Sequence, residues 1–155
     1  MEIEHKDRSI RDYTKAGQQI VFNNCQFGKL SPTDIDFCFE FKGKYLILAE
    51  VKTIGNDILD GQRYALERII RNWCATKGNK ALYVLVHHDT PQEKKEIDIS
   101  SGIVSKLFLN GKDTKLKRQT TFSELLYYIG KVWEVEFLTK LTNTMEKHDK
   151  FTEKR

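Results

Sequence analysis

Residues 35–52 place charged side chains inside the most apolar part of the sequence. The segment reads IDFCFEFKGKYLILAEVK, with two apolar runs on either side of Lys42-Gly43-Lys44. Glycine supplies the positive φ that a tight hairpin turn requires, so the segment predicts two antiparallel strands over 35–41 and 44–52. The second run is nearly all apolar, which is typical of a strand covered on both faces. Burying Asp36, Glu50 or Lys52 there is costly unless a partner compensates the charge.

The remaining apolar patterns predict an α/β domain. Apolar residues at helical spacing indicate helices at 6–19, 56–76 and 122–135. A continuous apolar run predicts a buried strand at 80–86, and two shorter runs predict a hairpin within 103–118. This order of elements predicts a mixed central β-sheet with one layer of helices on each face.

Local signals indicate where several of these elements begin or turn. Asn56 or Asp57 can cap the helix that precedes the strand at 80–86. Thr121 and Glu124 have the spacing of a capping box, which predicts the start of the last helix. The pair Asn110-Gly111 predicts the turn of the second hairpin.

Composition indicates one globular domain, expected over residues 1–142, followed by a charged tail at 143–155. The sequence has 155 residues, of which 39% are hydrophobic and 31% charged, as in ordinary soluble domains. No apolar run approaches the roughly 20 residues of a membrane span, and the N-terminus lacks the apolar stretch of a secretory signal. The three cysteines are widely spaced, which favours neither disulfides nor zinc. We therefore expect a cytoplasmic protein with no membrane association.

Acidic and basic residues are segregated along the chain, although the net charge is only +4. Carboxylates gather between residues 34 and 60, and a basic cluster follows later, opposed only by Asp113; its members are Lys106, Lys112, Lys115, Lys117 and Arg118. This distribution predicts a protein that holds a cation at one place and contacts a polyanion at another. The alternative is that the basic cluster is simply a solvated hairpin.

Strand periodicity predicts that acidic residues of the first hairpin meet near its open end. Alternate side chains share a face, so the hairpin can bring Asp36 opposite Glu50, with Lys52 on the same face as Glu50. Asp34 has the same parity as Asp36, so periodicity does not choose between them. Two adjacent carboxylates repel, and a hard divalent cation such as Mg²⁺ or Mn²⁺ removes this conflict. The carbonyl of Val51 is a further oxygen ligand.

This set of groups indicates hydrolysis of a phosphodiester. A bound cation lowers the pKa of a water ligand and neutralises phosphate charge. Lys52 beside it can position the attacking water or stabilise negative charge that develops on phosphorus. Lys29, Lys44 and Arg63 are expected to contact phosphates around such a site, giving affinity without sequence specificity.

An Asp on one strand of a hairpin and Glu-x-Lys on the next resembles the PD-(D/E)XK nuclease superfamily. Asp36, the turn at Gly43 and Glu50-Val51-Lys52 look most like the RecB-like and phage-nuclease branches, in which the acidic residue opens the first strand. The resemblance therefore favours Asp36 as the main metal ligand. In a second register, Pro32-Thr33-Asp34-Ile35 is similar to the Pro-x-Asp-Ile of archaeal Holliday-junction resolvases, which keeps Asp34 as an additional or substitute ligand.

The resemblance implies a restriction-endonuclease-like core and a further site residue. Members of the superfamily often place a glutamine at the start of the following helix, and Gln62 matches that role. Many also carry a glutamate on the first helix, where this chain offers only Glu2, Glu4 or the shorter Asp12. The number of metal ions therefore stays open.

The resulting hypothesis is a small Mg²⁺- or Mn²⁺-dependent endonuclease with catalytic residues Asp36, Glu50, Lys52 and Gln62. Nucleic acid is the expected partner, with DNA favoured over RNA, in a bacterial or phage-infected cell. The basic residues Lys112, Lys115, Lys117 and Arg118 would contact its backbone. An RNA endonuclease of the same fold and a non-catalytic nucleic-acid-binding module are the alternatives. A homodimer would let one small site act on two strands, and the sequence leaves the oligomeric state open.

Overall fold

The computed structural model describes residues 25, 29, 32–94 and 96–139. The chain divides into two compact units, Met1–Asp34 and Ile35–Arg155. Every helix and strand that the structure describes belongs to the second unit. The helix expected at 6–19 and the tail at 143–155 lie outside the described residues.

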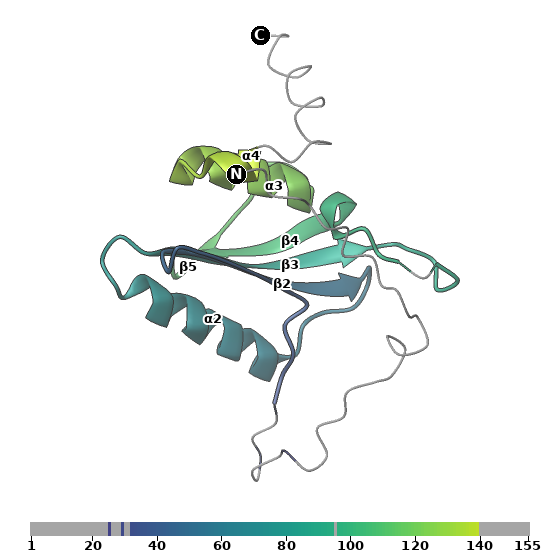
Figure 1. The fold of residues 1–155 in the computed structure, drawn as a ribbon. Coiled ribbons are helices and arrows are strands. Elements are labelled where there is room, and N and C mark those ends of the chain that lie inside the picture. Colours follow the sequence, from purple (N-terminus) through teal and green to yellow (C-terminus); the bar gives the residue numbers. More distant parts are fainter. Residues whose placement is uncertain (1–24, 26–28, 30–31, 95, 140–155) are drawn as a thin grey trace, which may run out of the picture. The chain divides into compact units, whose positions relative to one another are not determined.

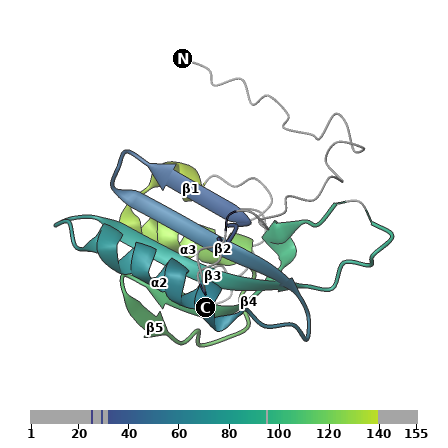
Figure 2. The same cartoon turned by 90° about the horizontal axis from the view of Figure 1, so that it is seen from below.

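The second unit is built on a five-stranded mixed sheet in which the strands follow one another in chain order (Figures 1 and 2). Strands β2 and β3 run parallel, and the other neighbouring pairs are antiparallel. The strands are β1 (Phe37–Phe41), β2 (Tyr45–Thr53), β3 (Lys80–His88), β4 (Ile103–Leu109) and β5 (Lys112–Thr114). The mixed sheet expected from the sequence is confirmed.

Helices cover both faces of this sheet, as expected for the α/β class. Figure 1 shows α2 (Asp60–Cys74) on one face and α3 (Phe122–Trp133) with the short α4 (Glu136–Thr139) on the other. A turn of 3₁₀-helix, η1 (Ile99–Ser101), precedes β4. Among the residues described, no helix has the length and apolar character needed to cross a membrane.

Two apolar clusters, one on each face, hold these layers together. The face under α2 buries the even-numbered residues of β2 with apolar residues of β3 and the helix, among them Leu46, Leu48, Leu66, Ile70, Tyr83 and Leu85. The opposite face buries the odd-numbered residues of β2 against α3 and α4, among them Ile47, Ala49, Phe122, Leu125, Ile129 and Trp133. Burial of both faces explains why β2 reads as a continuous apolar run. It also means that Glu50, which shares parity with Leu46 and Leu48, faces α2.

The two turn signals and the capping box of the last helix are confirmed. Lys42 and Gly43 both have positive φ, 56° and 61°, as in the hairpin turn that matches strand twist. The second hairpin turns at Asn110-Gly111, again with two positive φ values. Thr121 and Glu124 form a reciprocal capping box at the start of α3.

The start of α2 differs from the expectation. The helix begins at Asp60, its N-cap is Leu59, and no side chain caps it. Asp57 does not cap the helix because its carboxylate accepts a hydrogen bond from Ile58 N (2.8 Å) and pairs with Lys106 Nζ (3.1 Å). Residues 54–59 therefore form a loop that Asp57 ties to β4. The first strand is also shorter than expected, since β1 begins at Phe37.

Candidate active site

The β1–β2 register brings Asp36 to the end of β2 at which Glu50 lies. Phe37 pairs with Ala49, so Asp36, one residue before β1, is placed opposite Glu50. Its Oδ2 accepts a hydrogen bond of 2.7 Å from the backbone N–H of Val51. This bond holds the carboxylate against β2 even though Asp36 lies outside the strand ladder.

Glu50 is a buried carboxylate whose charge is only partly compensated. The residue is 1% exposed, and its Oε1 accepts a hydrogen bond of 2.7 Å from Lys52 Nζ. Its Oε2 is buried and makes no hydrogen bond of normal geometry to any residue that the structure describes. Burial raises the pKa of Glu50 above its ordinary value and the nearby charge of Asp36 adds to this, while hydrogen bonding from Lys52 and Gln62 opposes the rise.

Gln62 and Lys52 approach Glu50 from different elements. Gln62 lies in the first turn of α2, which packs on the face of β2 that carries Glu50. Lys52 follows Glu50 by two residues on β2 and therefore shares its face. Its side chain is 29% exposed, so the ammonium can reach both Glu50 and solvent.

The oxygen atoms at this end of β2 fit a hard divalent cation. In a strand, the N–H and C=O of one residue point to the same side, so the Val51 carbonyl faces the β1 edge where its N–H meets Asp36. Asp36, the Val51 carbonyl and the carboxylate of Glu50 offer oxygen ligands of the kind that Mg²⁺ and Mn²⁺ prefer. Within the described part of the chain, no group of three or more His, Cys, Asp or Glu side chains converges.

The structure separates some of the expected phosphate contacts from this end of the sheet. Lys44 precedes β2 and lies at its opposite end, about 20 Å from Glu50 at roughly 3.3 Å per residue. Lys112 pairs with Leu109 at that same far end. Lys29 and Asp34 belong to the first unit, whose placement relative to the second is not described.

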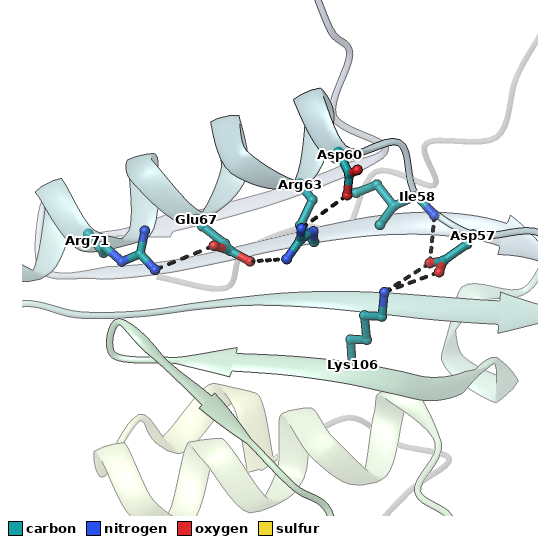
Figure 3. Close-up of polar contacts among 7 residues, drawn as sticks. All are labelled: Asp57, Ile58, Asp60, Arg63, Glu67, Arg71 and Lys106. Carbon is teal, nitrogen blue, oxygen red and sulfur yellow. Dashed lines mark hydrogen bonds and ion pairs between the residues drawn. The ribbon is translucent and has the colours of Figure 1, made fainter.

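Arg63 lies in a line of ion pairs along α2 rather than at Glu50 (Figure 3). It bonds Asp60 at 3.1 Å and Glu67 at 3.5 Å, and Arg71 bonds Glu67 at 3.5 Å from the other side. Glu67 is only 6% exposed, so two arginines compensate a nearly buried carboxylate. This role of Glu67 was not expected from the sequence. The signal was present in the spacing, because arginines stand four residues before and four residues after it.

Two more polar features near Glu50 were not expected from the sequence. Tyr83 is 2% exposed, and its hydroxyl makes no hydrogen bond to a described residue. Burial raises the pKa of Tyr83, and the charge of Glu50 raises it further.

At the 54–59 loop, hydrogen bonds from Ile58 N and then Lys106 lower the pKa of Asp57. His87 Nε2 lies 2.6 Å from the Asn56 carbonyl oxygen, which anchors the loop on β3.

Comparison of the chain with protein-family models, with curated proteins and with solved structures gave no match. The restriction-endonuclease-like core and the superfamily assignment therefore remain predictions that rest on Asp36, Glu50 and Lys52 and on their placement at one end of β2.

Proposed function

We propose that this chain is a metal-dependent phosphodiesterase of the PD-(D/E)XK type that hydrolyses the nucleic-acid backbone, with DNA preferred over RNA. The observation that carries the proposal is the burial of the Glu50 carboxylate with incomplete hydrogen bonding. The carboxylate is 1% exposed, lies opposite Asp36, and has one buried oxygen with no hydrogen bond of normal geometry to a described residue; a bound cation would compensate such a group.

Each residue of the site has a role in this proposal. Asp36, Glu50 and the Val51 carbonyl would hold Mg²⁺ or Mn²⁺, which when bound supplies charge neutralisation and an acidified water. Lys52, already within hydrogen-bond reach of Glu50, donates to the attacking water or to a phosphate oxygen. Gln62 holds the Glu50 side chain from the α2 side.

A purely structural Glu50–Lys52 ion pair explains the arrangement less well. Buried ion pairs are weak sources of stability, and apolar residues of similar size are often neutral or stabilising in their place. The pair also leaves Glu50 Oε2 buried without a hydrogen bond of normal geometry to any described residue. A stable sheet does not require such an atom, whereas a bound cation would compensate it.

The proposal is tested by incubating the full chain with a substrate panel in Mg²⁺, Mn²⁺ or EDTA. The panel contains supercoiled plasmid, linear duplex, single-stranded DNA, a four-way junction and RNA. We expect cleavage that requires the metal and that is lost in Glu50→Ala and in Lys52→Ala. Glu40→Ala is the matched control, because Glu40 is an exposed carboxylate on β1 far from Lys52 in the register. The proposal would be refuted if Glu50→Ala still cleaved the substrate, or if neither Mg²⁺ nor Mn²⁺ supported cleavage by the wild type.

A further inference from the structure

A hollow of about 490 Å³ opens at the β5 side of the sheet, between β4 and the segment that follows β5. Thr114 pairs with Leu107, and Val104 N donates to the Thr120 carbonyl at 2.9 Å. Between these two contacts the chain after β5 runs through residues 115–119, whereas the facing stretch of β4 holds only Ser105 and Lys106. The mismatch in length leaves a hollow lined by both segments.

The lining of this hollow is basic. Lys106, Lys115 and Arg118 border it, against a single carboxylate from Asp113. Lys115 is exposed and forms no ion pair with any described residue, and Arg118 is 62% exposed with one 3.5 Å contact to Glu124. A concave surface with this excess of cations attracts a polyanion.

The sheet register relates the hollow to the candidate active site. Glu50 on β2 and Lys106 on β4 both pair with Leu85 on β3, so they share one row and one face of the sheet. Two strand spacings separate them, which is about 10 Å. A nucleic-acid strand carries one charge per nucleotide, so a strand bound at Glu50 can place a nearby phosphate at Lys106.

The 54–59 loop lies between the two places. Ile58 is buried in the same cluster as Leu85, and Asp57 pairs with Lys106 at 3.1 Å. A nucleic-acid strand that leaves Glu50 toward Lys106 therefore crosses the outside of this loop, where Asp57 is 69% exposed. The Asp57 carboxylate competes with phosphate for Lys106.

We propose that this hollow binds the phosphodiester backbone of the substrate strand, near the phosphate held at Asp36 and Glu50. Lys106, Lys115 and Arg118 donate to phosphate oxygens there. The inference rests on the proposed function, because Glu50 fixes where the cleaved phosphate lies. Within the basic cluster of the sequence, Lys106, Lys115 and Arg118 border the hollow, whereas Lys112 and Lys117 do not.

The test measures binding without cleavage. Fluorescein-labelled single-stranded and duplex DNA of mixed sequence are titrated with the full chain carrying Glu50→Ala, over a series of KCl concentrations. Adding Lys115→Gln and Arg118→Gln together should reduce the slope of log affinity against log salt by about 1.4 for the single strand and about 1.8 for the duplex. Asp57→Asn should instead tighten binding, since it frees Lys106.

Lys77→Gln is the matched control, because Lys77 is an exposed lysine in the turn after α2 and does not border the hollow. Circular dichroism checks that the variants keep their fold, as expected for exposed side chains. An unchanged salt slope in the double variant, or an equal loss in Lys77→Gln, would overturn the inference. If the double variant reduces the salt slope but the wild-type chain cleaves nothing, the hollow is supported and the nuclease proposal is refuted. If the wild-type chain cleaves but the double variant leaves the salt slope unchanged, the nuclease proposal is supported and the hollow is refuted.

Discussion

Replacing Glu50 with glutamine should stabilise the folded chain at pH 8 while removing the proposed activity. The wild-type carboxylate is 1% exposed and its pKa is raised, so the folded state ionises it less readily than the unfolded state does. The stability that protonated Glu50 gives to the folded state is fully present below the ordinary pKa of 4.5, and it is lost as the pH rises through the raised pKa of the folded state. Glutamine has the same shape and no charge, so Glu50→Gln removes this loss.

The size of the effect follows from the partner of Glu50. Replacing a whole buried ion pair by well-packed hydrophobic residues of similar volume stabilises proteins by up to about 4 kcal/mol, which sets an upper limit for Glu50→Gln. Lys52 is 29% exposed and can be hydrated once the carboxylate is gone, and the amide oxygen of glutamine still accepts its hydrogen bond. The existing bond already offsets part of the cost in the wild type, so we expect a gain of about 1–2 kcal/mol at pH 8.

The opposite change, Lys52→Ala, should destabilise the chain. It leaves Glu50 buried without its only ion-pair partner among the described residues, which costs about 3 kcal/mol at high pH. Protonation of Glu50 relieves this cost, so the loss should shrink as the pH falls toward 4.5. The two variants therefore move stability in opposite directions although they alter the same hydrogen bond.

Urea unfolding at pH 4.5 and pH 8 in EDTA, followed by tryptophan fluorescence, measures both effects, since Trp133 is 3% exposed and reports on the core. We expect Glu50→Gln to exceed the wild type in free energy of unfolding at pH 8 and to match it at pH 4.5. A Glu50→Gln chain that is less stable than the wild type at pH 8 would show that the ion pair stabilises the fold, and the reasoning would fail.

Four further substitutions test separate features of the molecule. Asp36→Asn should abolish metal-dependent cleavage while changing the melting temperature little, because the amide oxygen still accepts the Val51 N–H bond; equal cleavage rates would contradict this. Tyr83→Phe should raise the free energy of unfolding by about 1 kcal/mol, since the lost hydroxyl is buried without a described partner, and urea denaturation would show a loss instead if the hydroxyl is bonded. Gly130→Ala should cost about 1–3 kcal/mol because its Cβ would lie 2.8 Å from Leu138 Cβ, whereas Gly61→Ala, with no atom within 4 Å, should gain about 0.5–1 kcal/mol by thermal melting.

Elements set by local chemistry could be predicted from the sequence. The turn at Lys42-Gly43 and the capping box of Thr121 with Glu124 depend on residues within a few positions of one another, and both are confirmed. The continuous apolar run of β2 also indicated a strand buried on both faces, which the two clusters confirm.

Features that depend on distant partners could not be predicted in the same way. Asp57 is of a residue type that often caps helices, but its carboxylate pairs with Lys106 and accepts a hydrogen bond from Ile58 N. Helix α2 therefore begins at Asp60 without a side-chain cap. Leu85 pairs with Glu50 in the β2–β3 register and with Lys106 in the β3–β4 register, and in the latter an irregularity between Leu85 and Val86 shifts the pairing. Sequence periodicity alone does not locate such a shift.

The candidate site could be predicted from the sequence only in part. Strand parity was sufficient to place Asp36, Glu50 and Lys52 on one face, and the register agrees with it. The burial of Glu50, and of an oxygen that makes no hydrogen bond of normal geometry to a described residue, depends on how α2 packs over β2, which only the three-dimensional structure shows.

Calorimetric titration of the full chain with Mn²⁺ tests the central claim most directly, because it needs no substrate. The account predicts saturable binding by the wild type that is lost in Glu50→Gln and retained in Glu40→Gln, in which the altered carboxylate bonds Gly43 N at the far end of β1. Equal binding by the wild type and Glu50→Gln, or no binding by either, would contradict the claim that Asp36 and Glu50 form a cation site.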